Sequence, residues 1–96
     1  MYARIASFEG VDVARMREEG ERRQREMPET VRGFLVLADS EQGKSRFITF
    51  YDSKEDLDAT ESHWEQMGSD IPEEMRGRRT SVEAFEVAAS QIPAMV

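Results

Sequence analysis

The one histidine and the one tryptophan of this 96-residue chain are neighbours, His63 and Trp64. An imidazole can take or pass a proton near neutral pH, and an indole offers a flat apolar surface to an aromatic ligand. On a helix that begins near Ser53, Trp64 falls in line with Leu57, and His63 lies about 100° round, on the flank of that stripe. His63 is therefore either a base or a partly exposed residue without a role. Trp64 is either a core residue or a stacking surface.

Polar side chains on the expected strands could line the same pocket, between the sheet and the helices. They are Tyr2, Arg4, Arg46 and Tyr51. Any of them could equally lie in an interface between two copies of the chain.

Gly20 interrupts the thin apolar stripe of the first expected helix, which covers residues 12–27. A glycine inside a helix costs about 1 kcal/mol relative to alanine. Either Trp64 or a ligand approaches the backbone closely at Gly20, or the helix simply tolerates a glycine at this position.

Several kinds of chemistry are not expected. The chain has one histidine and no cysteine, so the sequence predicts neither a metal site nor a cofactor. It contains no Gly-x-Ser-x-Gly elbow and no Ser-His-acid arrangement with recognisable spacing. Residues 38–45 are similar to a phosphate-binding loop, but such a loop must open a helix, and this one precedes an expected strand.

The formal net charge of −7 argues against nucleic acid as a partner. Arginines gather at residues 22–25 and 76–79, where glutamates interleave them, as on a solvated face. No stretch approaches the roughly 20 apolar residues that span a bilayer, and the first residues lack a signal-peptide pattern. We therefore expect no membrane partner and a cytoplasmic protein.

The expected elements follow the order strand, helix, strand, strand, helix, strand. Strands are expected at residues 2–8, 33–38, 46–51 and 80–88, and helices at 12–27 and from Ser53, whose capping start includes Asp56, to an exit at Gly68. This order predicts an α+β, ferredoxin-like βαββαβ domain over residues 1–88, followed by a tail at 89–96. Its four-stranded antiparallel sheet has residues 2–8 and 46–51 at the centre and both helices on one face.

The two strands at 33–38 and 46–51 are apolar on both faces. Phe34 and Val36 alternate with Leu35 and Leu37, so whichever set meets the helices, the other set needs a cover. Packing of two sheets against each other in a homodimer would supply it.

Four segments resemble the antibiotic biosynthesis monooxygenase-like superfamily of dimeric α+β barrels. They are Met1-Tyr2-Ala3-Arg4, Gly33-Phe34, the turn at 39–44 and the strand exit at 48–53. The resemblance covers nearly the whole domain and implies a cavity between the sheet and helices of each protomer. It also implies either a cofactor-independent oxygenase acting on polycyclic aromatic or quinol molecules, or a heme-degrading enzyme that relies on asparagine, tryptophan and histidine. This chain has no asparagine, and its histidine directly precedes its tryptophan, so heme degradation is not expected.

Two hypotheses for function follow. In the first, the chain is a cofactor-independent monooxygenase for a small aromatic or quinol molecule. His63 and Tyr51 are then the proton acceptor or orienting donor, and Trp64, Gly20 and Arg4 contact the substrate. In the second, the chain is a non-catalytic module that binds a small molecule or only dimerises.

Overall fold

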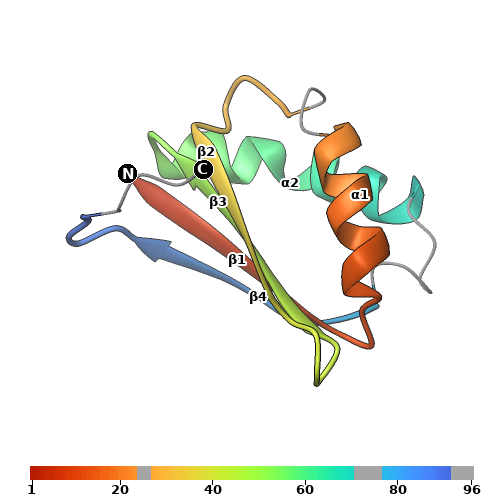
Figure 1. The fold of residues 1–96 in the computed structure, drawn as a ribbon. Helices are drawn as coiled ribbons and strands as arrows, with labels where there is room; N and C mark the ends of the chain where they lie inside the picture. Colours follow the sequence, from red (N-terminus) through yellow and green to blue (C-terminus); the bar gives the residue numbers. More distant parts are fainter. Residues whose placement is uncertain (24–26, 71–76, 92–96) are drawn as a thin grey trace.

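The computed structural model describes residues 1–23, 27–70 and 77–91, and contains four strands and two helices in those ranges. Along the chain these are β1 (Tyr2–Glu9), α1 (Val13–Arg23), β2 (Gly33–Asp39), β3 (Lys44–Tyr51), α2 (Lys54–Asp70) and β4 (Arg78–Glu86). The strands form one antiparallel sheet in the order β2-β3-β1-β4. Both helices lie on one face of it (Figure 1). The predicted ferredoxin-like α+β fold, with the first and third strands at the centre, is confirmed.

The register decides which side chains face the helices. Arg4 on β1 lies opposite Thr49 on β3, and Thr49 lies opposite Phe34 on β2. Directly opposed residues share one face of a sheet, and Arg4 pairs with Glu61 of α2. This row therefore lies on the helix side, and the residues that alternate with it lie on the other side.

The predicted cap of Ser53 and Asp56 is confirmed and Asp12 caps α1 as well, but the predicted ends of both helices are wrong. The carboxylate of Asp12 accepts a hydrogen bond from the Arg15 amide at 3.2 Å, and Ser53 Oγ accepts one from the Asp56 amide at 3.2 Å. Met27 lies outside any helix, because the residue before a proline is disfavoured in the α conformation.

Helix α2 continues past Gly68 to Asp70. A single glycine weakens a helix by about 1 kcal/mol, which does not end it.

The turn between β2 and β3 has the chemistry of a hairpin. Asp39 Oδ1 accepts hydrogen bonds from the amides of Glu41 at 3.1 Å and Gln42 at 3.3 Å, and Gly43 has a φ of 63°. The turn leads directly into β3, so the segment that is similar to a phosphate-binding loop does not open a helix.

Strand β4 is displaced from its predicted range of 80–88 by two residues at each end. It begins at Arg78. The preceding residue, Gly77, has a φ of 74°, and this left-handed conformation directs the chain so that it pairs with the end of β1. Beyond its last residue, the Val87 amide still donates to the Met1 carbonyl at 2.9 Å. Most of the predicted tail at 89–96 lies outside the described residues.

The core is small, and much of it is polar. Its buried apolar residues are Ala3, Ala6, Val11, Tyr51, Leu57 and Trp64, and its buried polar ones are Arg4, Ser45, Thr49 and Thr60. Arg4, Thr49 and Thr60 have hydrogen-bond partners, whereas Ser45 Oγ has none among the described residues. The first three therefore mark where the interior is specified most closely.

The sheet face opposite the helices carries no other element of the described chain (Figure 1). Leu37 on β2 and Phe85 on β4 are each 50% exposed on this face, and Ile48 and Phe50 between them are only half-buried. The face thus has apolar side chains from one edge strand to the other, with Arg46 and Glu83 also exposed on it. Neither helix of the described part is long and apolar enough to cross a membrane.

Candidate functional site

A row of rings crosses the helix side of the sheet from β2 to α2. Trp64 lies on the same inward stripe of α2 as Leu57 and meets the ring of Phe47 edge-on, with centroids 5.3 Å apart. Phe47 meets Phe34 of β2 at 6.0 Å. On the helix itself, the His63 ring lies 5.1 Å from that of Trp64.

The helices leave the β2 end of this row partly uncovered. Phe34 and Phe47 are half-buried, and Val36, which is opposite Phe47 in the sheet, is 44% exposed. Apolar side chains on the helix side of a sheet normally lie beneath a helix. The β2 end of this row of rings therefore offers aromatic surface to a small molecule.

A series of hydrogen bonds to side chains of β3 fixes the indole of Trp64 on its sheet side. Its Nε1 donates to the Tyr51 hydroxyl at 2.8 Å, and that hydroxyl is 2.9 Å from Thr49 Oγ1. Tyr51 and Thr49 are both 0% exposed. Water therefore does not compete for these bonds, and the orientation of the indole is set by β3.

His63 has an unsatisfied nitrogen. Its Nε2 is buried and has no hydrogen-bond partner within the described ranges, although the side chain as a whole is only half-buried. A buried polar atom without a partner costs roughly 1–3 kcal/mol. Such atoms in native proteins are explained by strain, by an ordered water or ion, or by a catalytic role, and Ser45 Oγ is a second such atom among the described residues.

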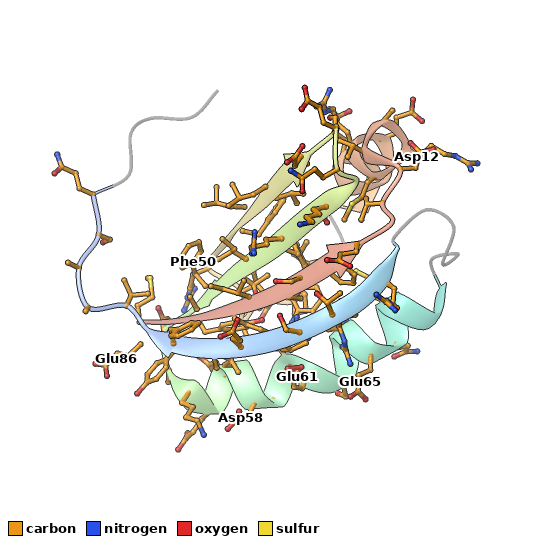
Figure 2. All side chains as sticks on the ribbon, turned by 90° about the horizontal axis from the view of Figure 1, so that it is seen from below. Asp12, Phe50, Asp58, Glu61, Glu65 and Glu86 are labelled. Atoms are coloured by element: carbon orange, nitrogen blue, oxygen red, sulfur yellow. The ribbon has the colours of Figure 1, made fainter. Side chains whose placement is uncertain are left out.

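An ion pair lies on the other flank of Trp64. The Nε of Arg4 donates to both carboxylate oxygens of Glu61, at 2.7 and 3.0 Å, and its guanidinium carbon lies 5.9 Å from the centroid of the Trp64 ring. Glu61 and Glu65 lie on successive turns of α2 (Figure 2). Glu61 and His63 are two positions apart, about 200° round the helix, so the pair and the imidazole are on opposite sides of the indole.

Threonine hydroxyls join the segment before β2 to α2 beside this site. Thr60 Oγ1 donates to the Asp56 carbonyl at 2.7 Å and lies 2.6 Å from Thr30 Oγ1. Because Thr60 has a single hydroxyl proton, Thr30 must be the donor of the second bond. The segment that leads into Phe34 is thus fixed against the helix that carries His63.

Four of the five predicted site residues are brought together: Trp64, His63, Tyr51 and Arg4. Gly20 lies in α1, but its surroundings fall outside the described part. Sequence reasoning missed Phe34, Phe47 and Thr49 as site residues. Their strand alternation placed them in two possible sets, without indicating which set meets the helices.

No group of three or more possible metal ligands occurs among the side chains that the structure describes.

No protein-family model matches the chain, and no curated protein matches it either. Among solved structures, it is similar to the crystal structure of an arginine-to-serine variant of MhuD that has two manganese protoporphyrin IX molecules bound per active site. The similarity has a TM-score of 0.61 at 17% sequence identity, and covers 97% of this chain and 100% of that one. The chain therefore shares the fold of that protein, which here is a four-stranded antiparallel sheet with two helices.

Proposed function

We propose that this protein binds a small, uncharged polycyclic aromatic or quinol molecule beside His63 and Trp64 and oxidises it with molecular oxygen, without a cofactor. The observation that carries the proposal is the Nε2 of His63, which is buried and has no hydrogen-bond partner among the described residues, at the α2 end of the row of rings. A ligand hydroxyl at that nitrogen would supply the missing hydrogen bond, and the rings would hold the apolar part.

The proposed chemistry needs one base and oxygen. When Nδ1 of His63 carries the ring proton, Nε2 has a lone pair and takes a proton from the substrate. The resulting electron-rich anion reduces oxygen. In total the substrate loses two hydrogens and gains one oxygen atom, and the second oxygen atom leaves with both hydrogens as water.

The other predicted residues have supporting roles in this proposal. Trp64 is only 6% exposed, so it contacts the substrate once the side chains that cover Nε2 of His63 have shifted. Tyr51 acts as the orienting group because it holds the indole nitrogen. Arg4 lies over the indole from the opposite flank, and Gly20 of α1 is proposed to leave room for the substrate.

A porphyrin does not fit this site as folded. Nε2 of His63, the imidazole nitrogen that could bind a heme iron, is buried, and its ring stands edge-on to Trp64. A single hydroxyl group needs only a local shift of the side chains that cover the nitrogen. We derive no step through a heme.

Anthrone is a suitable probe, because oxygen converts it to anthraquinone and water with the balance given above. We expect anthrone to quench the fluorescence of Trp64 under argon, and anthraquinone to form after oxygen is admitted. Replacement His63→Ala is expected to lower the rate of oxidation about 100-fold or more, the usual contribution of a general base. Ser62→Ala, at the exposed neighbouring position of α2, is the matched control and should leave the rate unchanged. Oxidation by the wild-type protein no faster than in buffer would refute the enzymatic proposal.

The complete burial of Tyr51 favours a second candidate, a non-catalytic module that binds a small molecule. A hydroxyl that is 0% exposed and already bonded to Trp64 cannot meet a substrate directly. In that case anthrone would quench Trp64 under argon, but no anthraquinone would form above the background rate.

We further propose that the protein is a homodimer in which the open faces of two sheets pack against each other. The open face carries exposed Leu37 and Phe85 at its two edges, so the patch spans all four strands. Exposed apolar patches of this kind mark interaction sites, and two identical faces can cover each other about a two-fold axis.

Phe85→Glu is expected to give a monomer, because packing of the two faces would bury a carboxylate at this position without a partner. Val82→Glu is the control on the same strand. Val82 is opposite Ala6 on the helix side, so this variant should remain a dimer. Light scattering after size-exclusion chromatography distinguishes the two states, and a monomeric wild-type protein at micromolar concentration would contradict the prediction.

A further inference from the structure

We infer that Thr49 is a positioning residue of the site and fixes the plane of the Trp64 indole through Tyr51. The inference rests on the proposed function for its effect on ligand binding. Its structural part concerns the indole itself and is measured without any ligand.

Neighbouring strand positions give this arrangement its rigidity. Thr49 and Tyr51 are two residues apart on β3, so their side chains point to the same face, and both are 0% exposed. Threonine is β-branched and has few χ1 choices in a strand. Its hydroxyl therefore presents a fixed point to the Tyr51 oxygen, 2.9 Å away.

The protons carried by Trp64, Tyr51 and Thr49 determine which group donates each hydrogen bond in this series. An indole N–H can only donate, so the Tyr51 oxygen must accept from Trp64. The phenol proton then needs an acceptor of its own, and Thr49 Oγ1 is within hydrogen-bond distance. Without that hydroxyl, the Tyr51 proton would be buried without a partner or would turn the phenol away from Trp64.

The indole plane matters because other site rings are set against it. Phe47 and His63 both meet Trp64 edge-on, at 5.3 and 5.1 Å and interplanar angles of 90° and 79°. A rotation of the indole would change the space between these rings. Thr49 is joined to the indole by hydrogen bonds through Tyr51, and acts through that residue.

The test compares Thr49→Val, which keeps the shape and removes the hydroxyl, with Thr49→Ser, which restores the hydroxyl on a smaller side chain. Because Trp64 is the only tryptophan, its indole N–H gives a single resonance in a ¹⁵N-labelled sample. We expect Thr49→Val to shift that resonance and to weaken anthrone binding under argon about ten-fold, or about 1.4 kcal/mol. Thr49→Ser should bring both back towards the wild-type values.

A double variant shows whether Thr49 acts through Tyr51. In a Tyr51→Phe background, Thr49→Val is expected to have no further effect on the indole resonance or on anthrone affinity. An unchanged resonance in Thr49→Val, or an equal loss of affinity in both backgrounds, would overturn the inference. If the wild-type protein does not bind anthrone, the proposed function fails, and the indole resonance alone still decides the role of Thr49.

Discussion

Gly77→Ala is expected to lower the free energy of unfolding by roughly 3 kcal/mol or more, from backbone strain and steric overlap together. Gly77 has a φ of 74°, and a Cβ built there would overlap the carbonyl oxygen of Glu9 and lie 2.9 Å from Cγ2 of Val11. Neither neighbour can move cheaply, because Glu9 is the last residue of β1 and Val11 is buried in the core. Urea denaturation followed by Trp64 fluorescence measures the loss.

Gly10→Ala is the matched control for this prediction. Gly10 has a nearly equal φ of 71°, but a Cβ there would meet nothing within 4 Å. The free energy of unfolding of Gly10→Ala should fall only by what the left-handed backbone costs an alanine, about 1–2 kcal/mol. Equal losses in the two variants would show that β4 can shift away from the end of β1, contrary to the close approach at Gly77.

The parts of the fold that depend on neighbouring residues could be predicted from the sequence. Ser53 with Asp56, and Gly43 in its turn, are local signals, and the structure has both features. The alternation of strand residues placed Phe85 on one face of β4 and Val82 and Ala84 on the other. Together these signals were sufficient for the order of elements and the sheet topology.

The ends of helices depend on small differences in free energy, so they were less predictable from the sequence. Met27 was expected within the first helix because Pro28 was taken as its stop, but the restriction on the residue before a proline acts one position earlier. Gly68 was expected to end the second helix, and α2 runs on to Asp70. A glycine is a strong terminator only where the chain adopts a left-handed conformation.

The candidate site could be predicted only in part, because its contacts join distant segments. Arg4 and Glu61 are separated by 57 positions, and nothing in either local sequence indicates the pair. The helical stripe correctly placed Trp64 in the core and His63 on its flank. The sequence could not show that Phe47 and Thr49, rather than Ile48 and Phe50, face that helix, because both sets contain a large aromatic residue.

The ion pair beside Trp64 leads to the second large effect. Glu61→Ala is expected to lower the free energy of unfolding by about 2 kcal/mol, because it leaves the guanidinium of Arg4, with a side chain only 3% exposed, without its carboxylate. The value is below that for a fully buried pair, since Glu61 is 39% exposed and water can take over part of its role. Denaturation in urea at constant ionic strength provides the measurement.

Asp52→Ala separates the effect of burial from that of ion-pair geometry. The pair between Arg32 and Asp52 has the same 2.7 Å separation, but its side chains are 57% and 51% exposed. Exposed pairs contribute about 0–1 kcal/mol, so this variant should be nearly as stable as the wild type. Replacing both members of the inner pair, Arg4→Met with Glu61→Leu, should recover most of the stability lost in Glu61→Ala, because no unpaired charge is then buried. If Glu61→Ala lowered the free energy of unfolding no more than Asp52→Ala, the Arg4 guanidinium would be hydrated in solution. It would then not be held in one position over the Trp64 ring.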